Sequence, residues 1–284
     1  AAWEPEVLVV TSPHQIMYTD YFHISPGRGA TGDMSAFGAP ETKMVVEYDA
    51  PLRDEIIRCG EAAGLQVGTL GQRDPYLDHG TFVPLYFMRE AGVDCPILRI
   101  GLSGFSPLDH YRLGQCIAQA VENLGRRAVF VASGDLSHKL KDDGPYGFAP
   151  EGPEFDRQVT EAMAAGDFLR FLTIDPVLCD QAAECGLRSF QIMAGALDGQ
   201  AVEAKLFSHE GVTGVGYGVA IFAVTGPDDD RRFGEQCAEL ERARLAEKKA
   251  SEDPWVKLAR LSLETFVKTG ERLDQLPKGL PDEM

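Results

Sequence analysis

Apolar residues occur along the chain in two alternating patterns, and together these predict an α/β domain. Short apolar runs predict buried strands at Glu6–Val10, Met44–Tyr48, Pro96–Leu102, Arg127–Ala132, Val202–Phe207 and Tyr217–Val224. Helical spacing of apolar positions predicts helices at Pro51–Ala63, Thr81–Glu90, Pro107–Leu124, Pro153–Ala165 and Ser189–Leu197. Because several helices separate the strands, we expect a mostly parallel or mixed central sheet flanked by helices in one domain, residues 1–226.

The pattern changes after the last predicted strand. A polar break, TGPDDDRR, is followed by a segment dense in charged residues and helix formers, which predicts a charged helical linker over residues 227–252. Asp253 and Pro254 then open an amphipathic helix, WVKLARLSLETFVKTG. We expect residues 253–284 to form a helical tail, too short for a core of its own.

Composition narrows the function without identifying it. The formal net charge of the 284 residues is −17, and no basic stripe interleaved with aromatic residues occurs, so nucleic acid and anionic membranes are not expected partners. No apolar run is long enough to span a membrane, and the N-terminus lacks a signal-peptide pattern. The six scattered cysteines favour free thiols. A cytoplasmic protein is the expectation.

Three histidines follow predicted strands or turns where chemistry is expected. His14 ends the stretch Ser-Pro-His after the first strand, His79 lies in a turn between Asp78 and Gly80, and His138 ends SGDLSH after the strand AVFVAS. Ligands of open α/β sheets bind beyond the carboxyl ends of the strands, so these histidines could converge. His79 also has an ordinary structural explanation as a turn residue, and His138 as a residue that caps backbone carbonyls.

Two acidic residues complete the candidate site. Asp135 could orient His138, or it could cap a turn. Glu184 precedes the helix GLRSFQIMAGAL, where helix amides favour a carboxylate. Two histidines and one carboxylate would match the ligand set of non-haem ferrous iron, and a further histidine could act as base.

The motifs themselves resemble those of one family. Ser-Pro-His, DHGTFVPLYF and ASGDLSH occur in the order found in class III extradiol ring-cleavage dioxygenases, typified by the B subunit of protocatechuate 4,5-dioxygenase. The resemblance covers about residues 6–225. The stretch ECGLRSFQIMAGALDG is more similar to the related Memo-like proteins, and the tail resembles the opening of an AMMECR-type domain.

The resemblance implies an activity and a role for each candidate residue. His14, His79 and Glu184 would hold Fe(II), and His138 would be the acid/base residue that takes a proton from a catecholic substrate, with Asp135 orienting it. O2 would be the second substrate. In Memo-like proteins a cysteine takes the ligand position, which corresponds here to Cys185 and would favour zinc or copper. The alternative function is therefore a Memo-like metal-binding accessory protein without ring cleavage, with a homo-oligomer or an AMMECR-type domain as partner.

Overall fold

The computed structural model describes residues 4–273, which form two compact units. The first unit ends at Gly234, and the second begins at Glu235. Most of helix α8 (Phe233–Ala250) and all of α9 (Pro254–Thr269) belong to the second unit. The predicted helices of the linker and tail are thus present, and the part of the tail from 274 to 284 lies outside the described residues. No described helix is long and apolar enough to cross a bilayer.

The first unit is built on a parallel three-stranded sheet. Its strands, in spatial order, are β6 (Ile97–Gly101), β1 (Val7–Ser12) and β7 (Ala128–Ala132). In the central strand every residue is buried, as its almost continuous apolar run predicts. This confirms the α/β class with a parallel central sheet flanked by helices.

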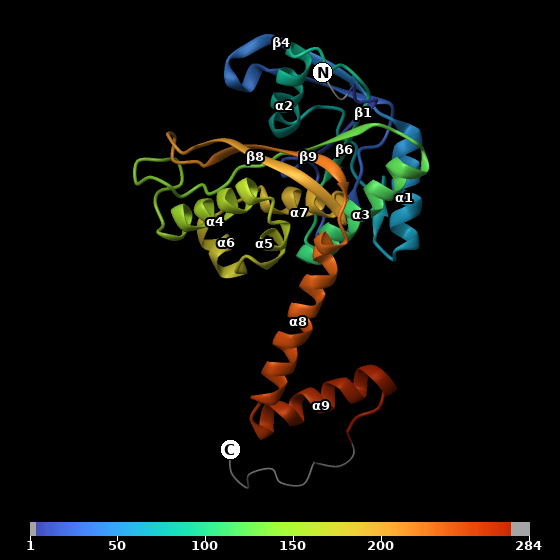
Figure 1. Cartoon of the computed structure of the whole chain (residues 1–284), viewed down its shortest axis with the longest axis vertical. Coiled ribbons are helices and arrows are strands. Elements are labelled where there is room, and N and C mark those ends of the chain that lie inside the picture. The colour runs from blue at the N-terminus through green and yellow to red at the C-terminus, as the bar shows by residue number, and fades with distance from the viewer. Residues whose placement is uncertain (1–3, 274–284) are drawn as a thin grey trace. The chain divides into compact units, whose positions relative to one another are not determined.

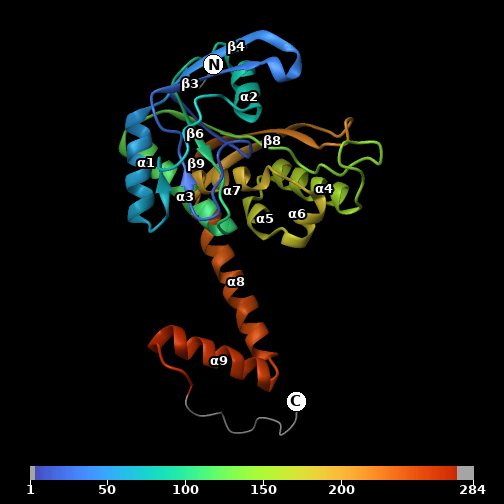
Figure 2. The same ribbon diagram turned by 180° about the vertical axis from the view of Figure 1, so that it is seen from behind.

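Alternate residues of β1 face two different cores. Val7 and Val9 pack in a cluster with residues of helices α1 (Ala50–Ala62) and α3 (Pro107–Asn123). The intervening Leu8 and Val10 pack on the other side, in a cluster with residues of strands β3 (Gly29–Met34) and β4 (Ala39–Glu47) and helix α2 (His79–Glu90). Figures 1 and 2 show these elements on the two sides of the sheet. The two-residue period of a strand therefore produces both cores.

The remaining strands form pairs outside the central sheet. The pairs are β2 (Phe22–His23) with β5 (Val67–Gly68), β3 with β4, and β8 (Gln200–Glu210) with β9 (Tyr217–Pro227). Of the six predicted strands, three thus lie in hydrogen-bonded pairs of their own. The connection from Glu210 to Tyr217 is short, which suits an antiparallel hairpin rather than a crossover. Strand β3 is missing from the prediction because GATGDM is not an apolar run.

Four α-helices lie between β7 and β8. They are α4 (Glu151–Ala165), α5 (Phe168–Thr173), α6 (Pro176–Ala182) and α7 (Leu187–Ala196). The prediction misses α5 and α6, which are too short to show a helical period but begin with capping aspartates. Helix α7 packs closely on α3, since a Cβ at Gly195 would lie 1.8 Å from the carbonyl oxygen of Tyr111.

The carboxyl ends of β1 and β7 meet at one edge of the sheet. The two strands are parallel neighbours, so the loops that carry His14 and His138 leave the sheet side by side. Strand pairing therefore explains how residues more than 120 positions apart in sequence can approach one another.

Candidate metal and acid–base site

Two histidine rings, which we call the histidine pair, lie against each other at this edge. The ring centroids of His14 and His79 are 4.0 Å apart, with the planes tilted by 37°. His14 follows β1 by two residues, and His79 is the first residue of α2, whose N-cap is Asp78. Both histidines are exposed. The predicted convergence of the first two motifs is thus present in the structure.

Glycine after His79 leaves room for this approach. A Cβ at Gly80 would lie 2.5 Å from the Ser12 hydroxyl and 3.1 Å from Cδ2 of His14. Any other residue there would displace at least one of these groups, so the sequence Asp-His-Gly supplies a helix cap, a histidine and the space for its partner.

The pKa of His14 lies below its ordinary value, which favours the neutral ring. Partial burial of the ring lowers this pKa, and the neighbouring His79 lowers it further, while Asp78 and Asp135 act in the opposite direction. A metal-binding imidazole must be neutral, so this environment suits a ligand. The influence of Asp135 also shows that the SGDLSH loop approaches the histidine pair.

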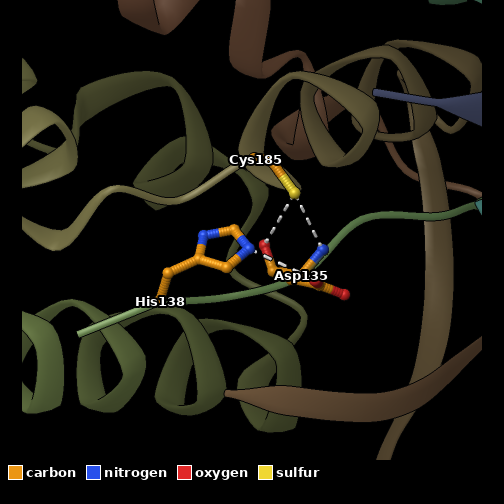
Figure 3. A group of neighbouring side chains, drawn as sticks. All are labelled: Asp135, His138 and Cys185. Atoms are coloured by element: carbon orange, nitrogen blue, oxygen red, sulfur yellow. Dashed lines mark hydrogen bonds and ion pairs between the residues drawn. The ribbon is translucent and has the colours of Figure 1, made fainter. Parts of the chain in front are cut away.

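Three further side chains, which we call the acid–base cluster, gather beside that loop. Potential ligand atoms of Asp135, His138 and Cys185 lie within 4.8 Å of one another (Figure 3). The carboxylate Oδ2 of Asp135 is 3.3 Å from Nε2 of His138. The sulfur of Cys185 accepts a hydrogen bond from the backbone N–H of Asp135 at 3.2 Å.

Hydrogen-bond acceptors face both ring nitrogens of His138. Nδ1 faces the backbone oxygen of Ala183, and Nε2 faces the Asp135 carboxylate. Because both partners are hydrogen-bond acceptors, this arrangement favours a ring with a proton on each nitrogen. The hydrogen bond to Asp135, followed by the interaction with Cys185, raises the pKa of His138 to about 11.

Adjacent residues Glu184 and Cys185 point in different directions. Oε2 of Glu184 accepts a hydrogen bond from the backbone N–H of Leu187 at 2.7 Å, at the start of α7. Burial raises the pKa of Glu184, and this N–H opposes the rise. Glu184 thus stabilises a helix end, where helix amides favour a carboxylate, whereas the Cys185 sulfur joins the acid–base cluster. The role of Glu184 as a metal ligand stays a prediction.

Backbone contacts hold the acid–base cluster in place. The N–H of Gly216 donates to the oxygen of Ser137 at 2.7 Å, and the N–H of Leu136 donates to the oxygen of Gly216 at 2.9 Å. On the other side, the N–H of Gly186 donates to the oxygen of Asp135 at 2.8 Å. The hairpin β8–β9 and the turn before α7 therefore clamp the SGDLSH loop between them.

Aromatic side chains that sequence reasoning missed border the site. Phe37 lies edge-on to His79 with centroids 5.5 Å apart, and Tyr146 lies edge-on to His138 at 5.0 Å. Both are 61% exposed, which is unusual for such large rings and leaves them available to a ligand. Neither occupies a motif, so nothing in the sequence distinguishes them from other loop aromatics.

The chain matches a known family over most of its length. The family model described as the catalytic LigB subunit of aromatic ring-opening dioxygenase matches residues 1–220. The 2-aminophenol 1,6-dioxygenase beta subunit of a Pseudomonas species is 26% identical over 242 residues, covering 76% of this chain and 77% of that protein. This match agrees with the resemblance drawn from the motifs.

A second relative is more similar and is longer than this chain. Protein CA_C1420 of Clostridium acetobutylicum is 35% identical over 290 residues, covering 99% of this chain. The chain spans 61% of the length of that relative. Among solved structures, an uncharacterized protein of Escherichia coli K12 superimposes with a TM-score of 0.53 at 17% identity, over 78% of this chain and 86% of that one, which shows a shared fold.

Proposed function

Because the chain belongs to the family of the catalytic LigB subunit of aromatic ring-opening dioxygenase, we propose that it is a metal-dependent dioxygenase. Its substrates would be O2 and a small aromatic ring with two adjacent polar groups, such as a catechol. Its metal would be Fe(II). The observation that carries this proposal is the contact between two exposed histidine rings, together with a third histidine, His138, that Asp135 orients and whose charge acts on His14.

The donor groups fit a divalent metal. His14 and His79 offer imidazole nitrogens, and the neutral form of His14 is the form that binds metal. For the third ligand we propose Cys185, since its sulfur already lies in the acid–base cluster, whereas the Glu184 carboxylate is engaged by α7. Bound there, the metal would supply Lewis-acid and redox chemistry between substrate and O2.

His138 would supply the proton transfers. Acceptors face both of its ring nitrogens and its pKa is raised, so the protonated ring, a proton donor, is the favoured form. To serve as base it must first release the Nε2 proton, for which the Asp135 carboxylate at 3.3 Å is the available acceptor. We therefore propose that Asp135 and His138 act as one proton-exchanging pair, which sharpens the role expected from the motif alone.

The position of Cys185 favours a second candidate function. Thiolate ligands prefer soft ions, so a site built from two histidines and a cysteine would also suit zinc or Cu(I). In that case the chain would be a Memo-like metal-binding accessory protein without ring cleavage. It would act in the cytoplasm, as a homo-oligomer or with an AMMECR-type domain that its tail, residues 253–284, would begin.

Metal counting on matched variants tests both candidates. Wild type and the variants His14→Ala, His79→Ala, Glu184→Gln, Cys185→Ser and His138→Phe would be reconstituted anaerobically with Fe(II). Bound iron and oxygen uptake with a panel of catechols and 2-aminophenol would then be measured. We expect iron to be lost with either histidine of the pair and with Cys185, and retained with Glu184→Gln and His138→Phe.

Oxygen uptake separates an enzyme from an accessory protein. If the dioxygenase proposal is correct, wild type consumes oxygen only with an aromatic substrate, and His138→Phe binds iron without turnover. Stoichiometric iron with no uptake on any substrate would favour the accessory function. Loss of iron in Glu184→Gln, with full binding in Cys185→Ser, would restore Glu184 as the third ligand.

A further inference from the structure

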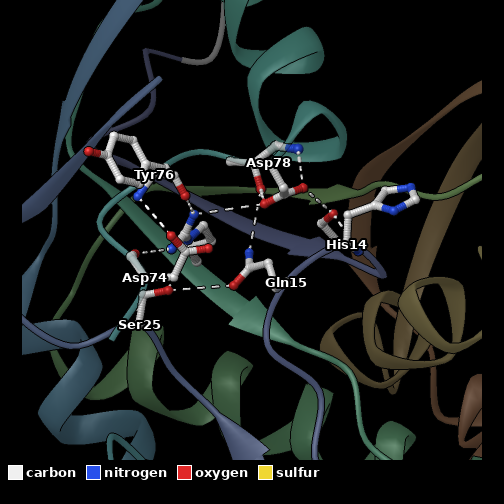
Figure 4. Close-up of polar contacts among 9 residues, drawn as sticks. His14, Gln15, Ser25, Asp74, Tyr76 and Asp78 are labelled. Carbon is white, nitrogen blue, oxygen red and sulfur yellow. Dashed lines mark hydrogen bonds and ion pairs between the residues drawn. The ribbon is translucent and has the colours of Figure 1, made fainter. Parts of the chain in front are cut away.

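One carboxylate, that of Asp78, is bonded to both segments that carry the histidine pair (Figure 4). Its Oδ1 accepts a hydrogen bond from the Ser12 hydroxyl at 2.6 Å. That hydroxyl oxygen in turn accepts the backbone N–H of His14 at 3.2 Å. The end of β1 and the position of His14 are therefore linked to Asp78 through a single intervening oxygen.

The same carboxylate fixes the start of the helix that carries His79. Asp78 is the N-cap of α2, and its Oδ1 accepts the backbone N–H of Thr81 at 3.0 Å. Its Oδ2 accepts the Thr81 hydroxyl at 2.8 Å. With both oxygens engaged, the carboxylate cannot turn without breaking a bond to one of the two segments.

A buried arginine supplies the positive charge beside this carboxylate. Arg99 lies in the parallel sheet with its side chain only 2% exposed, and one of its terminal nitrogens is 3.8 Å from Oδ2 of Asp78. Arg99 also donates to the backbone oxygens of Tyr76 at 2.5 Å and Asp74 at 2.6 Å. It thereby anchors the loop that leads into α2 to the central strands.

Gln15 adds a weaker link between the same segments. This residue follows His14 directly and is buried, and its side-chain N–H donates to the Thr81 hydroxyl at 3.4 Å. Its side-chain oxygen accepts the hydroxyl of Ser25 at 3.5 Å, and Ser25 accepts a bond from Arg99 at 2.9 Å. The polar contacts thus close into a ring beneath the histidine pair.

We propose that Asp78 is a positioning residue that sets the spacing and mutual orientation of the His14 and His79 rings, with Arg99 as its fixed counter-charge. This inference rests on the proposed function, because it describes how the metal-binding histidines are held. A ligand pair that is already spaced binds a metal without first ordering two loops, which increases affinity.

Another aspartate in the same unit provides a matched control. Asp49 is also buried, caps the helix α1 by accepting the N–H of Leu52 at 3.0 Å, and lies 3.6 Å from Arg126. Like Asp78, Asp49 is a helix N-cap with an arginine nearby, but its own helix does not begin with a histidine. Asp49→Asn therefore measures what the loss of a charged, buried cap does by itself.

The experiment compares Asp78→Asn, Ser12→Ala and Asp49→Asn with wild type. Co(II) affinity would be measured from its visible absorption bands, and the imidazole signals of the metal-free proteins from NMR spectra. Urea unfolding would report stability. We expect Asp78→Asn to lower Co(II) affinity by about 10–100-fold and to shift the signals of both histidines. Ser12→Ala should shift His14 alone, and Asp49→Asn should lower the urea midpoint while leaving affinity and both signals unchanged.

Each outcome decides the proposal. Wild-type affinity and unchanged imidazole signals in Asp78→Asn would overturn it, as would an equal loss of affinity in Asp49→Asn. If Asp78→Asn does not fold, Ser12→Ala decides, because an unshifted His14 signal there would refute the link through the hydroxyl. If wild type binds no Co(II), the proposed metal site fails, and the metal-free imidazole signals still test the positioning role.

Discussion

The histidine pair and the acid–base cluster approach each other but are held by different kinds of interaction. Side chains hold the pair, through the buried carboxylate of Asp78 and its partner Arg99. Backbone groups hold the cluster, through hydrogen bonds that link the SGDLSH loop to Gly216 and Gly186. We infer that the histidine pair is sensitive to the loss of a charge. The acid–base cluster is sensitive to the addition of a side chain where glycine is required.

The largest effect on stability is expected when the arginine that supports the histidine pair, Arg99, is replaced. Arg99→Leu would leave the buried Asp78 carboxylate without a cation and two backbone oxygens without a donor. Breaking a buried pair in this way destabilises a protein by about 3–5 kcal/mol. Urea unfolding would measure the loss. Arg58→Leu is the control, because Arg58 is 62% exposed and its ion pair with Glu55 should contribute no more than about 1 kcal/mol.

A smaller effect on stability is expected from a methyl group added to the loop of the acid–base cluster. Gly134 has φ +153°, and a Cβ there would lie 2.4 Å from the Cα of Gly186. Backbone strain and overpacking together should cost about 2–4 kcal/mol in Gly134→Ala. Urea unfolding and a thiol-reactivity assay of Cys185 would be compared with Gly147→Ala, whose added Cβ meets no neighbour although φ is also positive. Equal losses in both variants would mean that strain alone, and not the contact with Gly186, sets the cost.

The prediction for Asp135 concerns pH. The folded pKa of His138 is raised from 6.5 to about 11, so its contribution to stability is complete below pH 6.5 and is lost as the pH rises toward 11. Asp135→Asn removes the main cause of the shift. We expect a loss of about 1–2 kcal/mol at pH 6, reduced because the pair is partly exposed. The difference in unfolding free energy from wild type should shrink by pH 9.

A control distinguishes this proton from others that titrate in the same range. His138→Phe removes the imidazole, so Asp135→Asn added to it should produce no further pH dependence. If the wild type and Asp135→Asn curves run parallel between pH 6 and pH 9, Asp135 does not hold the His138 proton.

Loops that follow strands were predictable from the sequence, whereas side-chain directions within them were not. The apolar runs at Glu6–Val10 and Arg127–Ala132 form neighbouring parallel strands, and that alone brings the first and third motifs to one edge. Glu184 and Cys185, by contrast, lie in a short turn without periodicity, where adjacent side chains separate according to tertiary contacts. Hydrophobic patterning carries no signal for that choice.

The burial of Arg99, the cation that supports the histidine pair, was also not predictable from the sequence. Arg99 interrupts the apolar run Pro96–Leu102, and an arginine in a strand is ordinarily expected to face solvent. Its partner Asp78 is adjacent to His79 in sequence but twenty-one residues from Arg99. Only the fold brings the loop before α2 against Arg99 in β6, so a buried cation was not predictable from either local pattern.

The smallest effect on stability is expected at Gly80. A change there should affect the histidine pair and leave the acid–base cluster unchanged. Gly80→Ala adds a Cβ 2.5 Å from the Ser12 hydroxyl and 3.1 Å from the His14 ring, in a helix where alanine is favoured over glycine by about 1 kcal/mol. The gain in helix propensity offsets the crowding. The free energy of unfolding, measured with urea, should therefore change by less than about 1 kcal/mol. The His14 ring must nevertheless move. Co(II) affinity should therefore fall while the pH dependence of His138 is unchanged, and a variant that keeps its metal affinity would show that the pair tolerates the displacement.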